Sequence, residues 1–152
     1  MRNAKRIFQW AQEVAWAYDF FNARKQGSGS AYTKEVIDAL DYLVMEEMGA
    51  GIVNQFLCKE SRQMVDFWLP DEHAIVELEL NLSGATPLLE KEVVKALLAK
   101  DAGQDVRHLI LIGDPGSTQR HQSSTAKAVI QWMERQHQIR VEIWELSETA
   151  KA

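Results

Sequence analysis

Cysteine and long apolar runs are scarce in this sequence, and each scarcity removes a class of protein. The single cysteine, Cys58, excludes an intramolecular disulfide and a cysteine-based zinc cluster. No apolar run approaches the roughly 18 residues that span a bilayer, which argues against a membrane protein. The basic, amphipathic start over residues 1–13 lacks the continuous apolar segment and cleavage site of a secretory signal. A reducing, cytoplasmic setting without membrane attachment is therefore expected.

Positive charge is also in short supply. The formal net charge of −5 argues against a protein that coats nucleic acid nonspecifically. It does not argue against a nuclease, because an acidic metal site itself adds negative charge. With 152 residues, of which 46% are hydrophobic, the chain is long enough to bury the core of an ordinary globular domain.

The first part of the chain predicts a helix followed by a flexible joint. Aromatic and apolar residues recur at helical spacing over residues 4–26, which predicts one long amphipathic helix that packs on the core or on a second subunit, with a membrane or DNA role as the alternative. The Gly-Ser stretch at 27–30 then predicts a joint at which this helix can swing away. We therefore divide the chain into an N-terminal helix with its joint, residues 1–30, and a domain over residues 31–152.

The domain reads as an α/β (α+β) fold built on a mixed sheet. Consecutive strands early in the domain predict an antiparallel meander, and the later strand–helix–strand order predicts a parallel pair. Helices are expected at 31–48, 86–100 and 119–138, strands at 52–58, 106–112 and 139–146, and a β-hairpin over 64–81 that turns at 70–73.

Three acidic residues stand out on the predicted hairpin. Asp66 falls on its first strand and Glu77 and Glu79 on its second. Glu77 and Glu79 share one face because strand side chains alternate. A buried carboxylate needs a partner, and converging carboxylates are tolerated when a divalent cation neutralises them. The hairpin is therefore a candidate metal-binding platform, although outward acids that protect an edge strand from aggregation would give the same pattern.

Other charged residues are candidates for the same site. Glu47 falls in the apolar stripe of helix 31–48, so it is either a further metal-site acid or part of a frayed last turn that reaches water. Lys91 and Lys95 lie four residues apart on helix 86–100 and share a face, either as a cation source for the site or as solvated lysines. The four histidines form no metal-spaced pair, and surface or capping roles are expected for most of them.

At these residues the sequence resembles the PD-(D/E)xK nuclease superfamily, the restriction-endonuclease-like fold. Its core is a helix, a three-strand meander, a helix and a strand, which is the predicted order over roughly residues 31–115. Asp66 matches the first acid of the motif, although Val65 replaces the usual Pro. Glu77-Leu78-Glu79 matches the acid-x-Lys part, with Glu79 where Lys is usual. A subset of restriction endonucleases carries Glu or Gln at that third position.

The resemblance implies Mg²⁺- or Mn²⁺-dependent hydrolysis of phosphodiester bonds in DNA. Asp66, Glu77 and a main-chain carbonyl near Leu78 would bind the metal, and Glu79 would ligate it or orient the attacking water. Lys91 and Lys95 are candidates for the missing motif lysine. Cleavage of both strands would need a homodimer, because this chain has one such site. The alternative is a catalytically inactive module of the same fold, whose long N-terminal helix docks onto itself or onto a partner.

Overall fold

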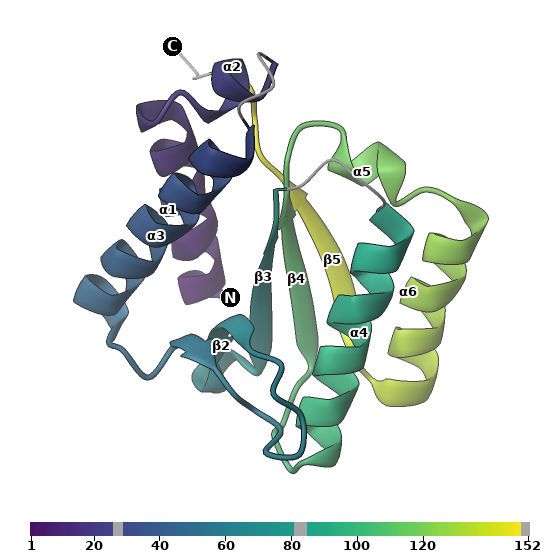
Figure 1. Ribbon diagram of the computed structural model, residues 1–152. Coiled ribbons are helices and arrows are strands. Elements are labelled where there is room, and N and C mark those ends of the chain that lie inside the picture. Colours follow the sequence, from purple (N-terminus) through teal and green to yellow (C-terminus); the bar gives the residue numbers. More distant parts are fainter. Residues whose placement is uncertain (26–28, 81–84, 150–152) are drawn as a thin grey trace.

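A five-stranded mixed sheet forms the centre of the molecule. The computed structural model describes residues 1–25, 29–80 and 85–149. The strands follow the chain order across the sheet, β1-β2-β3-β4-β5 (Figure 1). They are β1 (Val53–Gln55), β2 (Val65–Leu69), β3 (Ala74–Glu79), β4 (His108–Gly113) and β5 (Arg140–Glu145). The helices are α1 (Arg2–Ala17), α2 (Phe20–Lys25), α3 (Gly29–Met48), α4 (Ala85–Asp101), α5 (Ser117–Arg120) and α6 (Ser124–His137), with a 3₁₀ turn, η1 (Pro70–Glu72), between β2 and β3.

The two halves of the sheet pair in different ways. The first three strands are antiparallel neighbours, and β3, β4 and β5 run parallel to one another. Four consecutive residues of β4, Leu109–Ile112, are completely buried, as the unbroken apolar run of a doubly covered parallel strand requires. The predicted mixed α/β fold, with its meander followed by a parallel pair, is therefore confirmed.

Helices cover both faces of the sheet (Figure 1). On one face, residues of α1 and α3 such as Ile7 and Leu40 share a hydrophobic core with Val76 and Ile110 of the sheet. On the other face, α4 and α6 pack on residues such as Leu111. None of the helices within the described ranges is both long and apolar enough to cross a membrane.

Two of the predicted long helices are each broken into two. The predicted helix 4–26 ends at Ala17 and resumes at Phe20, because Asp19 takes a left-handed backbone conformation, with φ of 53°. The break turns Phe20 back into the core, where its side chain is fully buried. The predicted helix 119–138 is split into α5 and α6, and the Ser123 side chain caps the start of α6 by accepting a hydrogen bond from the Ala126 N–H.

Helix α1 is fastened at both ends. Near its start, the Glu72 carboxylate accepts hydrogen bonds from the N–H groups of Asn3, at 2.7 Å, and Ala4, at 3.1 Å. This carboxylate satisfies two otherwise unpaired N–H groups and sits favourably at the positive end of the helix dipole. Farther along, the side chains of Gln12 and Trp16 both donate to the carbonyl of Ser147, at 2.8 and 3.0 Å. The prediction that this helix packs on the core is thus confirmed, and the idea that it swings away from the domain is corrected. Residue 26 of the predicted helix, residues 27 and 28 of the predicted joint and residues 81–84 of the loop before α4 lie outside the described residues. Residues 29 and 30 of the predicted joint belong to α3.

The packing of α1 makes a testable prediction. Ile7→Ala removes a fully buried side chain and should lower the free energy of unfolding by about 2–5 kcal/mol. Lys5→Ala, on the exposed side of the same helix, is the matched control and should change it by less than about 0.5 kcal/mol. Urea denaturation measures both, and equal, small effects would mean that α1 does not belong to the core.

Candidate functional site

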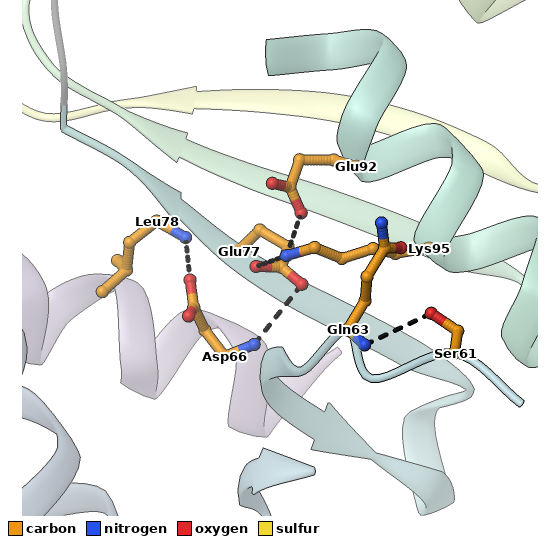
Figure 2. A network of polar contacts seen from close by, with 7 residues as sticks. All are labelled: Ser61, Gln63, Asp66, Glu77, Leu78, Glu92 and Lys95. Atoms are coloured by element: carbon orange, nitrogen blue, oxygen red, sulfur yellow. Dashed lines mark hydrogen bonds and ion pairs between the residues drawn. The ribbon is translucent and has the colours of Figure 1, made fainter. Parts of the chain in front are cut away.

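The hairpin brings Asp66 and Glu77 face to face. Phe67 pairs with Val76 in the β2–β3 ladder, so the next step of the register sets Asp66 opposite Glu77. The Asp66 N–H donates to Glu77 Oε1 at 3.4 Å, and Asp66 Oδ2 accepts from the Leu78 N–H at 2.8 Å (Figure 2). The amide and carbonyl of one strand residue point to the same side, so the Leu78 carbonyl also faces β2. The three predicted oxygen donors are therefore brought together.

Helix α4 contributes two more charged groups to this place. The Lys95 ammonium contacts Glu92 Oε2 at 3.0 Å and Glu77 Oε2 at 3.4 Å, and so bridges the two carboxylates (Figure 2). The exposed fractions of these side chains are only 9% for Lys95, 2% for Glu77 and 7% for Glu92. Asp66, Glu77, Glu92 and Lys95 are hereafter the acidic cluster. Its three carboxyl groups outnumber its one ammonium group.

Burial and like charge shift the titration of this cluster. Burial raises the pKa of Glu77 well above its ordinary value, and the neighbouring Asp66 and Glu92 carboxylates raise it further, against the opposing effect of Lys95. The pKa of Glu92 is also raised, mainly by burial, although Lys95 opposes this. For Lys95, burial lowers the pKa but the carboxylates outweigh it, so the net pKa lies above its ordinary value. Lys95 is therefore a cation at neutral pH. The raised pKa values of Glu77 and Glu92 mean that these carboxylates are stabilised by a further positive charge nearby.

A fourth acid, Asp41 of α3, lies beside the cluster. Burial raises the pKa of Asp41 to about 6, and the Asp66 charge adds to this, while a hydrogen bond from the Asn54 side chain at 3.3 Å opposes it. Asn54 lies on β1 in a left-handed backbone conformation, with φ of 52°. Asp41 thus adds negative potential around Asp66 from a third element of the fold.

The structure selects among the predicted site residues. Lys95 joins the cluster, whereas Lys91, one helical turn earlier on α4, is exposed to solvent. Glu47 is not part of the site: its side chain is 52% exposed, and its contact is with Arg6, at 3.9 Å. Glu47 reaches solvent as the alternative interpretation expected, but from an intact helix and not from a frayed turn, because α3 continues to Met48.

Glu79 lies in a different buried pair. Its side chain is only 5% exposed and contacts His121 Nε2 at 3.3 Å, while His121 Nδ1 lies 2.7 Å from the carbonyl of Ser117. Glu79 pairs with His121 at the end of β3 and does not join the acidic cluster. The charged side chain that contacts Glu77 is Lys95. His121, for which a surface or capping role was expected, is buried as well.

Three residues with a part in these contacts were not predicted, namely Asp41, Glu92 and His121. For Glu92 a signal was present, because it lies three residues after Leu89 and four before Ala96, inside the buried stripe of α4. Asp41 likewise lies four residues after Ile37 on the core side of α3. His121 had no such signal, because the break between α5 and α6 decides where it points.

The donor set of the cluster fits a hard divalent cation. Asp66, Glu77 and the Leu78 carbonyl offer oxygen alone, and Mg²⁺ is commonly held by one or two carboxylates together with several waters. Over residues 1–25, 29–80 and 85–149 there is no ready-made group of three or more His, Cys, Asp or Glu side chains for a metal. Asp66 and Glu77 are the residues that could hold such an ion.

Comparison of this chain with protein-family models, with curated proteins and with solved structures found no match. The functional interpretation therefore depends on the geometry of the site and on the motif residues themselves.

The Glu79–His121 pair predicts how stability depends on pH. The contact with Glu79 raises the pKa of His121, so the stabilisation is complete below the unfolded-state pKa of about 6.5 and is lost as pH rises through the higher folded-state value. His121→Gln should flatten this part of the pH–stability curve, measured by urea denaturation between pH 6 and 9. Glu79→Gln should flatten it in the same way, and an unchanged slope in both variants would contradict the assignment.

Proposed function

We propose that this protein is a metal-dependent nuclease that hydrolyses phosphodiester bonds in DNA. The observation that carries the proposal is the position of Lys95, whose ammonium lies 3.4 Å from the second acid of the motif-like hairpin. Glu79 leaves the sequence motif without its lysine, and Lys95 supplies an equivalent positive charge from α4. Asp66, Glu77 and Lys95 would together supply two metal ligands and one positive charge for phosphodiester hydrolysis.

Asp66 and Glu77 would hold the cation, together with the Leu78 carbonyl. When bound, Mg²⁺ or Mn²⁺ neutralises charge on the reacting phosphate and acidifies a water molecule. Lys95 remains protonated, because the carboxylates raise its pKa. It would therefore act as a hydrogen-bond donor that orients water and stabilises developing negative charge, not as a general base.

The proposal extends to the substrate and the assembly. One site per chain cuts one strand, so cleavage of both strands of a duplex requires two copies, and a homodimer is the simplest arrangement. The single cysteine, Cys58, suits a reducing, cytoplasmic setting.

A second function is favoured by the internal balance of the same cluster. Lys95 pairs with both Glu77 and Glu92, so these groups form a buried ion-pair network without any added cation. Buried networks of this kind can serve to specify a fold. On this view the chain is a catalytically inactive binding or assembly module, and the cluster is structural.

Cleavage of plasmid DNA separates the two functions. We expect Glu77→Ala and Lys95→Ala each to lower Mg²⁺- or Mn²⁺-dependent cleavage by about 100-fold or more, since each removes several kcal/mol of charge stabilisation. Lys91→Ala, exposed on the same helix, is the matched control and should stay within about threefold of wild type. Equal, metal-independent background cleavage in all four proteins would exclude catalysis at this site.

Metal binding should also be visible as thermal stabilisation. A ligand that binds only the folded state adds about 2.7 kcal/mol at a hundred times its dissociation constant, which is several degrees in Tm for a domain of this size. We therefore expect millimolar Mn²⁺ to raise Tm in wild type and to leave Glu77→Gln almost unchanged. Calorimetry or thermal-shift assays measure this, and the same small shift in both proteins would favour the structural network.

A further inference from the structure

Lys95 is shared unequally between two carboxylates. Its ammonium is closer to Glu92, at 3.0 Å, than to Glu77, at 3.4 Å. Glu92 lies three residues before Lys95 on the same helix, so this contact is local to α4, whereas the contact with Glu77 joins α4 to β3. A small rotation of the Lys95 side chain can therefore break the second contact and keep the first.

The excess negative charge of the acidic cluster explains why Lys95 contacts Glu77. A buried carboxylate without a partner is costly, so Glu77 needs the Lys95 ammonium when it holds no other cation. Within the described residues, Lys95 is the only lysine or arginine that forms an ion pair with either Glu77 or Glu92. A divalent cation on Glu77 and Asp66 would replace this partner and repel the ammonium from close range.

We propose that Lys95 is a resident counter-ion that a divalent cation displaces from Glu77, and that Glu92 is the positioning residue that retains the displaced ammonium beside the site. This inference rests on the proposed function, because it takes Asp66 and Glu77 to be the cation-binding pair. It adds a role for Glu92, which the motif does not contain. Under this proposal Lys95 competes with the metal for Glu77 in the metal-free protein, and it donates hydrogen bonds to the reacting groups once the metal is bound.

Titration calorimetry with MnCl₂ and no DNA tests the exchange directly. Lys95→Met removes the competing ammonium and should bind Mn²⁺ about tenfold more tightly than wild type, the scale on which one close charge shifts a neighbouring equilibrium. Glu92→Gln removes the alternative partner, so Lys95 stays on Glu77 and Mn²⁺ should bind about three- to tenfold more weakly. Lys91→Met is the control for a lost surface charge and should bind as wild type does.

The double variant Lys95→Met/Glu92→Gln separates positioning from a general effect of charge. If Glu92 acts through Lys95, then Glu92→Gln should change Mn²⁺ affinity by at most about twofold once Lys95 is absent. An equal loss in both backgrounds would overturn the role of Glu92, since that would be the effect of a direct ligand or of charge alone. Should Lys95→Met fail to fold without metal, Lys95→Gln takes its place in the cycle.

The outcomes also distinguish this inference from the proposed function. If wild type binds Mn²⁺ and Lys95→Met binds it no more tightly, the exchange is overturned but the nuclease proposal stands. Absence of binding in wild type and in Lys95→Met would overturn both.

Discussion

A carboxylate buried in the middle of a sheet face is the constraint on which the rest of the site depends. The Glu77 side chain is 2% exposed, and its ionised form requires a positive neighbour. That neighbour comes from α4, so the rotation of α4 on the sheet is tied to the strand beneath it. Asp66, brought opposite Glu77 by the hairpin register, raises the demand for positive charge further. A cluster with too few cations favours any further positive charge, and the same shortage accounts for the position of Lys95.

The strand that carries Glu77 supports two separate polar groups. Glu77 and Glu79 are alternate residues of β3 and therefore about 7 Å apart along the strand. The first meets β2 and α4, and the second meets His121 at the C-terminal end of α5. The two environments differ in chemistry, since a lysine bridges the first and a histidine pairs with the second. Two acids on the same face of one strand thus have different environments, because the segments that cover them supply a lysine in one case and a histidine in the other.

The sequence predicted the parts of this arrangement that depend on local periodicity. Alternation placed Asp66 and Glu77 on the hairpin, and the helical repeat identified Lys95 as a possible source of charge. Periodicity alone could not distinguish Lys95 from Lys91, because the rotation of α4 on the sheet is a tertiary property. The same limitation left two interpretations open for Glu47. Glu92 and Asp41 were missed although their helical spacing from buried residues carried a signal. The break at Asp19 was missed because the helical apolar pattern of that segment continues across it. The break between α5 and α6 was missed because it falls in the polar stretch 117–125, which has no apolar period to interrupt.

The attachments of α1 bear on how the molecule assembles. Its first turn is capped by Glu72, and its later turns are tied to the carbonyl of Ser147. The partners therefore lie 68 to 135 residues farther along the chain. During synthesis α1 leaves the ribosome before either partner does, so its two attachments form only after Glu72 and Ser147 have followed it. Contacts this distant slow folding, and until they form the apolar side of α1 stays open to chaperones or to other copies of the chain.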